Sequence, residues 1–195
     1  MVISVIGGSG SGKDTQAELL SQKFETRHIS SGYIFREGEK QGNPLAIEAQ
    51  KMANQGKWVT DNITSKLVLE YVQKNCPTGF IITGYPRYLE QAHTFDEIVK
   101  TLNISLTCVI HISVSDKILI ERMKLQRAES LSMGDVRGDT SDEVIIQRLK
   151  SYHETINPLL TEYTTRNLLI DIDGSLPKEV VFSNILSSLS KLGIN

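Results

Sequence analysis

Short apolar runs alternate along this chain with longer segments of helical periodicity. Five runs have the length of a strand, and they cover residues 2–6, 28–29, 80–82, 108–112 and 168–172. The runs are continuous rather than alternating, which is typical of strands that are buried on both faces of a parallel sheet. The pattern therefore predicts a five-stranded parallel sheet.

The segments between these runs carry apolar side chains at spacings of three and four residues, as amphipathic helices do. Examples are Ala17, Leu20 and Phe24; Ile63, Leu67 and Tyr71; Leu149, Tyr152, Ile156 and Leu159; and Val181, Ile185 and Leu189. Strands that alternate with helices predict right-handed crossovers and a doubly wound α/β fold. In such folds, ligands bind beyond the carboxyl ends of the strands, so a site is expected at that edge.

The late helical segment carries start and stop signals. Thr140 and Glu143 form a capping-box pattern, Pro158 is expected to kink the helix or to end its first half, and Pro177 lies near the first turn of the last helix. Before this helix, residues 126–141 lack apolar periodicity and contain charged residues and glycines. They predict a mobile, charged loop, with an ordinary surface loop as the alternative.

Composition narrows the class of protein. The 195 residues carry a formal charge of −2, and a pI of about 6.1 argues against nonspecific nucleic-acid binding. No apolar run approaches the roughly 20 residues that span a bilayer, and the N-terminus lacks a signal-peptide pattern. Cys76 and Cys108 have no metal-type neighbours, which favours reduced thiols in a cytoplasmic protein. One α/β domain over residues 1–195 is expected.

A glycine-rich segment follows the first apolar run directly. Residues 7–15 have the sequence GGSGSGKDT, with the spacing G-x-x-x-x-G-K. Glycines let the backbone point its N–H groups at phosphate oxygens, and the dipole of the following helix adds to that field. A flexible turn is the alternative, but the order strand, loop, lysine and helix argues against it. The candidate ATP-binding residues here are Gly8, Gly10, Ser11, Gly12, Lys13, Asp14 and Thr15.

Asp14 stands where a general P-loop has a Ser or Thr that binds Mg²⁺. A carboxylate repels a neighbouring triphosphate, by about 4 kcal/mol for unit charges about 4 Å apart at intermediate dielectric. Asp14 is therefore tolerable if a cation lies between the two, or if its side chain turns away.

Four segments together resemble the adenylate kinase family over nearly the whole chain. They are residues 7–16, 28–36 (HISSGYIFR), 79–92 (GFIITGYPRYLEQA), and 136–139 (VRGD) with Arg148-Leu149 and Tyr152-His153 behind them. Each segment alone is a weak signal, whereas a G-Y-P-R segment at this distance from a P-loop is a strong one. The resemblance implies a P-loop NTPase fold with a helical NMP-binding insertion at about residues 30–60 and a short lid at about residues 126–140.

The resemblance also implies roles for single residues. Arg36 and Arg87 match the arginines that clamp the acceptor phosphate, a task that suits the planar guanidinium, and Gln91 matches the glutamine that recognises adenine. The implied NMP-binding set is Ser31, Arg36, Lys57, Trp58, Val59, Gly84, Tyr85, Arg87, Gln91, Arg137 and Arg148. Any single arginine could instead lie on a solvated helix face.

On the donor side the resemblance adds Arg122, Gly174 and Arg127 to the ATP-binding set, although the second family arginine falls at either Gln126 or Arg127. The implied catalytic set is Lys13, Arg87, Arg122, Arg137 and Arg148. These cations would align two polyanions and neutralise the transferred phosphoryl group, so no general base is required.

The implied activity is reversible transfer of the γ-phosphoryl group of ATP to AMP, giving two ADP, with Mg²⁺ as cofactor. The short lid lacks the cysteines and histidines of a zinc site, so no zinc is expected. The resemblance to short-lid kinases implies a monomer. The alternatives are a UMP/CMP-type or other NMP kinase, another small P-loop kinase, and a weakly active nucleotide-binding regulator of the same fold.

Besides Asp14, three positions depart from the family pattern. Thr83 stands where an aspartate usually helps to hold Mg²⁺ through water, Tyr33 replaces another aspartate, and Trp58 replaces a leucine beside the acceptor pocket. We hypothesise that Asp14, where the family usually has glycine, compensates for Thr83; drift in an enzyme of low activity is the alternative. Trp58 predicts either simple packing or an altered acceptor pocket.

Overall fold

A five-stranded sheet forms the centre of the computed structural model, which describes residues 1–132 and 141–194. The strand order is β2-β3-β1-β4-β5, and every neighbouring pair is parallel. The strands are β1 (Val2–Ile6), β2 (His28–Ser30), β3 (Phe80–Thr83), β4 (Leu106–Ser113) and β5 (Leu169–Asp173). The predicted parallel sheet and the α/β fold class are therefore confirmed.

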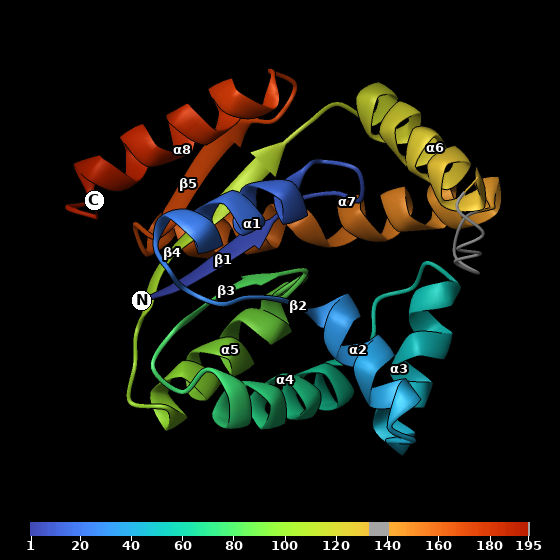
Figure 1. The fold of residues 1–195 in the computed structure, drawn as a ribbon, viewed down its shortest axis with the longest axis horizontal. Coiled ribbons are helices and arrows are strands. Elements are labelled where there is room, and N and C mark those ends of the chain that lie inside the picture. The colour runs from blue at the N-terminus through green and yellow to red at the C-terminus, as the bar shows by residue number, and fades with distance from the viewer. Residues whose placement is uncertain (133–140, 195) are drawn as a thin grey trace.

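The helices of the described residues cover both faces of this sheet (Figure 1). They are α1 (Lys13–Lys23), α2 (Ser31–Lys40), α3 (Pro44–Asn54), α4 (Asp61–Asn75), α5 (Leu89–Thr101), α6 (Asp116–Ser132), α7 (Asp142–Thr165) and α8 (Lys178–Lys191). Helices α1 and α8 lie on one face, where Leu20 and Ile185 share a buried cluster with Ile3 and Ile110 of the strands. This cluster fixes the helix that follows the glycine-rich loop.

Helices α4, α5 and α7 cover the opposite face. Phe95 of α5 is buried in a cluster with Phe80 of β3, and Leu159 of α7 is buried in another with Ile6 and Val109. Successive strand residues point to opposite faces, so both faces of each central strand are apolar, as the continuous runs predict.

The remaining helices lie near the carboxyl ends of the strands. In Figure 1, α2 and α3 lie to one side of these ends, and α6 lies across from them beside the first half of α7. Leu119 and Met123 of α6 form a small buried cluster with Ile145 and Leu149 of α7. The division of the chain into a core, an NMP-binding insertion and a lid stays a prediction.

Two predictions about the late helices are corrected. Helix α6 continues to Ser132, so residues 126–132 are helical and not part of a loop; residues 133–140 lie outside the described residues. Helix α7 continues through Pro158 to Thr165, so Pro158 does not end its first half, and the alternative of a kink stays a prediction. Its observed N-cap is Ser141, whose hydroxyl accepts from the Val144 backbone N–H. The predicted capping residue, Thr140, lies outside the described residues.

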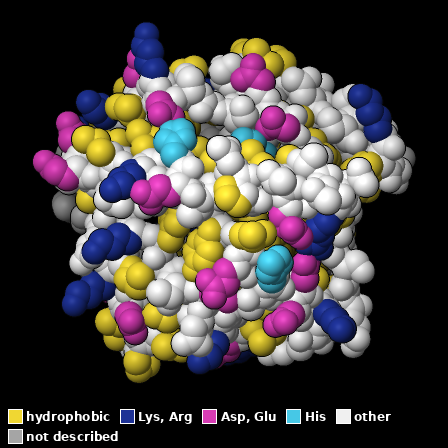
Figure 2. Space-filling model, turned by 180° about the vertical axis from the view of Figure 1, so that it is seen from behind, with side chains coloured by type: hydrophobic (Ala, Val, Ile, Leu, Met, Phe, Trp, Pro, Cys, Tyr) yellow, Lys and Arg dark blue, Asp and Glu magenta, His cyan; other side chains and the backbone are white. Residues whose placement is uncertain are grey.

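The surface opposite to the view of Figure 1 mixes charges of both signs. Figure 2 shows Lys and Arg side chains interspersed with Asp and Glu side chains over this face. Cys76 and Cys108 are both buried and free. Over the residues that the structure describes, no helix combines the length and the apolar character that crossing a bilayer demands.

Candidate functional site

The glycine-rich loop leads from β1 into α1 with a backbone that only glycine adopts easily. Gly10 and Gly12 have φ angles of +82° and +91°, in the left-handed region that side chains disfavour. A Cβ on Gly10 would come within 3.0 Å of the Leu119 carbonyl oxygen. The loop is closed by a hydrogen bond of 3.1 Å from the Ser11 N–H to the Gly8 carbonyl. The result is a tight turn at a helix N-terminus, which suits an anion.

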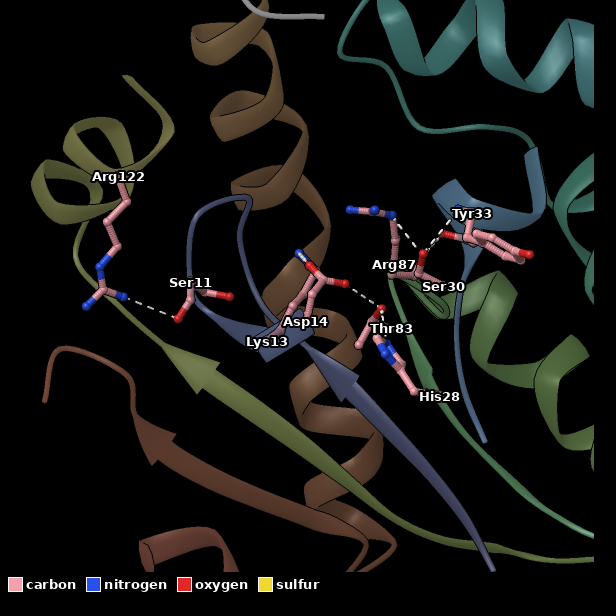
Figure 3. Close-up of polar contacts among 11 residues, drawn as sticks. Ser11, Lys13, Asp14, His28, Ser30, Tyr33, Thr83, Arg87 and Arg122 are labelled. Atoms are coloured by element: carbon pink, nitrogen blue, oxygen red, sulfur yellow. Dashed lines mark hydrogen bonds and ion pairs between the residues drawn. The ribbon is translucent and has the colours of Figure 1, made fainter. Parts of the chain in front are cut away.

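The lysine at the end of this loop contacts its neighbour in sequence. Lys13 Nζ lies 3.1 Å from Asp14 Oδ2, and the two side chains are 9% and 58% exposed. Thr83 Oγ1, at the end of β3, donates a 2.6 Å hydrogen bond to Asp14 Oδ1. Figure 3 shows the three side chains in a row beside the loop. Asp14 and Thr83, two of the positions that depart from the family pattern, are therefore bonded to each other.

The charge of Asp14 is stabilised by this surrounding. Desolvation works against the charged carboxylate, but it is outweighed by the charge of Lys13, by the hydrogen bonds from Thr83 and Lys13, and by His28. Together they hold the pKa of Asp14 well below its usual range, so the carboxylate is ionised at neutral pH.

A histidine extends this chain of contacts. His28 Nε2 lies 3.2 Å from Thr83 Oγ1, and His28 Nδ1 lies 3.3 Å from Glu18 Oε2. Because Thr83 donates its proton to Asp14, its oxygen is left to accept, and the Glu18 carboxylate can only accept as well. A neutral imidazole has one N–H, so it donates to one of these two partners at a time. Nothing in the spacing of His28 along the sequence points to Thr83. Only the pairing of β2 with β3 brings the two together.

The donor side of the site continues at β5. Arg122 of α6 donates from one guanidinium nitrogen to the Gly174 and Ser11 carbonyls, at 3.0 and 3.3 Å. Figure 3 shows this contact between Arg122 and Ser11. A Cβ on Gly174 would come within 2.4 Å of Ile112 Cγ2, so glycine is required there by packing. Three predicted ATP-binding residues are thus brought together beside the loop.

The predicted acceptor residues gather around a second glycine. Gly84 has φ of +72°, and its carbonyl accepts from Ser31 Oγ at 2.8 Å and from Arg87 Nε at 2.9 Å. A Cβ on Gly84 would come within 2.8 Å of an Arg87 terminal nitrogen and of Ser31 Oγ. The absence of a side chain therefore lets Arg87 and Ser31 converge.

Gln91 is held by backbone groups on both sides of its amide. Its Oε1 accepts from the Arg87 N–H at 2.8 Å, and its Nε2 donates to the Val59 carbonyl at 3.3 Å. The side chain is almost fully buried but still lines the cleft. The amide keeps one N–H and one lone pair that these bonds do not use.

The glycine-rich loop and the predicted acceptor residues border one cleft of about 840 Å³. Four predicted ATP-binding residues are not among its lining residues: Gly8, Ser11, Arg122 and Gly174. Lys13 and Asp14 lie on its wall, and so do several predicted acceptor residues: Ser31, Arg36, Lys57, Trp58, Val59, Gly84, Arg87, Gln91 and Arg148. Arg36 is exposed on α2, and Arg148 reaches the cleft from α7. Arg36 of α2, Arg87 in the turn after β3 and Arg148 of α7 therefore line the same cleft.

Two further predicted site residues, Tyr85 and Arg127, do not line the cleft. The side chain of Tyr85 is fully buried against Phe95, with ring centroids 5.4 Å apart, so it belongs to the core and not to the cleft wall. Arg127 forms a 2.6 Å ion pair with Asp142, whereas its neighbour Gln126 lines the cleft. Arg137 lies outside the described residues.

Comparison with known proteins agrees with this geometry. A family model described as "Adenylate kinase" matches residues 5–168. The adenylate kinase of Acetivibrio thermocellus is 33% identical, over 97% of this chain and 98% of its own. Adenylate kinase 1 of Schistosoma mansoni is 36% identical, over 99% and 94%, and the adenylate kinase of Bifidobacterium longum is 35% identical, over 97% and 100%. The resemblance found in the sequence is thus confirmed, and the chain belongs to the adenylate kinase family.

Proposed function

We propose that this protein transfers the γ-phosphoryl group of ATP to AMP, reversibly, giving two ADP. The observation that carries the proposal is the single cleft that has the glycine-rich loop on one wall and Arg36, Arg87 and Arg148 on another. One wall suits a triphosphate and the other a monophosphate, so the two reacting groups would meet end to end.

The proposed mechanism relies on alignment and charge. Lys13 would bind the distal phosphates of ATP, and the arginines would hold the acceptor phosphate and share the charge that spreads over the transferred group. Holding two reactants in line removes much of the entropic cost of their encounter. The acceptor oxygen is already an anion, so no side chain needs to remove a proton.

The chain offers a fitting place for Mg²⁺, which the family generally uses. Asp14 presents an ionised, half-exposed carboxylate beside the loop, and the Thr83 hydroxyl fixes its orientation. We propose that Asp14 holds the ion, directly or through water, in place of the carboxylate that is absent at position 83. A magnesium ion there would supply positive charge between the phosphates, and it would remove the repulsion between Asp14 and ATP.

The acceptor base is proposed as adenine because Gln91 lies at the cleft wall, and its amide has one donor and one acceptor side by side. Trp58 and Tyr33, which depart from the family pattern, are the features that favour another base. A coupled assay with ATP, Mg²⁺ and AMP, CMP, UMP, GMP or dTMP separates these acceptors. The highest kcat/KM is expected for AMP, and a preference for another monophosphate would replace the proposed acceptor while keeping the reaction.

The same assay tests a kinase-fold regulator, the alternative from a different class. A regulator would bind nucleotides tightly in a calorimeter yet form no ADP with any acceptor. That result would overturn the proposed reaction. We also propose that the protein is a monomer and that it is cytoplasmic. Size-exclusion chromatography with light scattering tests the oligomeric state.

A further inference from the structure

Trp58 lies in the short connection between α3 and α4, and it is the chain's single tryptophan. Its indole Nε1 donates to the Ser151 carbonyl at 3.0 Å and to Thr155 Oγ1 at 3.1 Å, both on α7. These bonds fix the edge of the ring to a helix that is more than ninety positions away in sequence, and so they fix the plane of the ring.

The same connection touches α7 at a second point. Ser151 Oγ donates to the Gly56 carbonyl at 3.4 Å. Gly56 has φ of +73°, and a Cβ on it would come within 2.9 Å of the Val144 carbonyl oxygen. The connection is therefore closely apposed to α7, so Trp58 cannot turn away without breaking contacts on both sides.

The face of the indole is directed at a cation. The Arg87 guanidinium carbon lies 4.3 Å from the ring centroid of Trp58, which is within the range of a cation–π contact. Arg87 Nε is bonded to the Gly84 carbonyl. Within residues 1–132 and 141–194, the two terminal nitrogens of Arg87 make no hydrogen bond. The guanidinium is thus held by its inner edge and by its face, and its outer edge is left for a ligand.

The charge of Arg87 needs compensation. Burial lowers the pKa of this guanidinium to about 10, while Asp14 acts to raise it and Arg148 acts to lower it. A partly buried cation that is bonded to no anion is costly. The π face of Trp58 supplies part of the missing compensation, and an anion in the cleft would supply the rest.

We infer that Trp58 is a positioning residue: its ring, locked to α7, holds the Arg87 guanidinium in the orientation that receives the phosphate of the acceptor nucleotide. The inference rests on the proposed function for the identity of that ligand. A leucine at this position would offer neither the N–H nor the π face, so this way of positioning Arg87 requires the tryptophan of this chain.

The first test compares a ligand that has the phosphate with one that lacks it. AMP and adenosine are titrated calorimetrically, without turnover, into the wild type, Trp58→Leu and Trp58→Phe. Trp58→Leu should weaken AMP binding by about three- to tenfold and leave adenosine binding unchanged, with Trp58→Phe in between because it keeps an aromatic face. Unchanged ATP binding and an unchanged melting curve serve as the controls for folding.

The second test asks whether the effect passes through Arg87. In an Arg87→Met background, Trp58→Leu should cause no further loss of AMP affinity, since there is no guanidinium left to position. In the wild type, AMP should change the fluorescence of Trp58 while adenosine should not, and Arg87→Met should abolish that change.

Two results would overturn the inference. Equal weakening of AMP and adenosine in Trp58→Leu would make Trp58 a wall of the base pocket, and unchanged AMP affinity would leave it with packing alone. Failure of the proposed function looks different, because the wild type would then bind AMP but form no ADP.

Discussion

Two parts of the cleft would hold phosphate groups by different means. The phosphate loop, residues 7–15, relies on backbone shape: glycines in the left-handed region, a close approach to Leu119 and a helix N-terminus behind them. The acceptor clamp, which we define as Ser31, Trp58, Gly84, Arg87 and Gln91, relies on side chains that are bonded to carbonyl groups and to a ring.

The difference predicts how each part responds to change. A backbone nest loses several N–H groups at once when one glycine is forced out of its conformation. A side-chain clamp loses one contact at a time, because its other members keep their own partners. A single substitution should therefore weaken phosphate binding strongly in the phosphate loop and only moderately in the acceptor clamp.

The largest effect is expected when the charge of Lys13, at the end of the phosphate loop, is removed. Lys13→Ala removes the buried ammonium group, and kcat should fall by roughly 1,000-fold, the scale for loss of a preorganised charge at the reacting phosphates. AMP affinity, measured calorimetrically, should stay within about twofold because the acceptor clamp is untouched. Lys23→Ala, at the exposed end of the same helix, is the matched control. Loss of AMP affinity as well would show that the two parts are not separate.

A glycine substitution tests the backbone shape of the phosphate loop directly. Gly10→Ala should lower kcat/KM for ATP by about tenfold to a hundredfold, since the loop must shift to relieve its contact with Leu119. Gly42→Ala is the matched control, because Gly42 has φ of +75° but no atom near its Cβ position. Both variants should lose about 1–2 kcal/mol of stability. Equal kinetic losses would mean that stability, and not the loop, explains the effect.

A smaller effect is expected where the two parts meet, at Asp14 and Thr83. Asp14→Gly should raise the Mg²⁺ concentration for half-maximal activity by about tenfold, the scale for losing one group that holds or orients a metal. The double variant Asp14→Gly with Thr83→Asp restores the family arrangement, and it should recover most of that loss. Mg²⁺ dependence that is unchanged in Asp14→Gly would make the proposed relocation wrong.

The backbone turn of the phosphate loop could be predicted from the sequence, whereas the side-chain contacts around it could be predicted only in part. The glycine spacing defines the phosphate loop locally, within nine consecutive residues, so no knowledge of the fold was needed. The bond between Asp14 and Thr83 joins residues 69 positions apart, and the sequence suggested only that one compensates for the other. His28 carried no signal at all, because its contact depends on which strand lies beside β2.

Helix α6 shows a second reason why part of the site could not be predicted from the sequence. Residues 126–132 lack an apolar stripe, which predicted a loop, but Gln, Arg, Ala, Glu and Leu are good helix formers and the helix continues. A shift of one residue turns a helical side chain by about 100°. Sequence comparison alone therefore could not decide between Gln126 and Arg127, whereas the structure places Gln126 on the cleft wall and pairs Arg127 with Asp142.

The smallest effect is expected outside both parts of the cleft, at a buried histidine. His111 Nδ1 lies 2.8 Å from Asp171 Oδ1, and Nε2 lies 2.8 Å from the Tyr152 hydroxyl. Burial lowers the pKa of His111, although the hydrogen bond and the charge of Asp171 act to raise it. Burial also raises the pKa of Tyr152 to about 12, so this hydroxyl keeps its proton and can donate to a neutral ring.

The sign of the resulting pH dependence follows from linkage. As the pH falls through the ordinary histidine pKa of 6.5, the unfolded chain binds a proton that the native ring resists, so the free energy of unfolding should decrease. His111→Gln removes this contribution, and urea unfolding between about pH 8 and about pH 5 should then show a flatter profile. An equally steep profile in His111→Gln would assign the acid sensitivity to other groups.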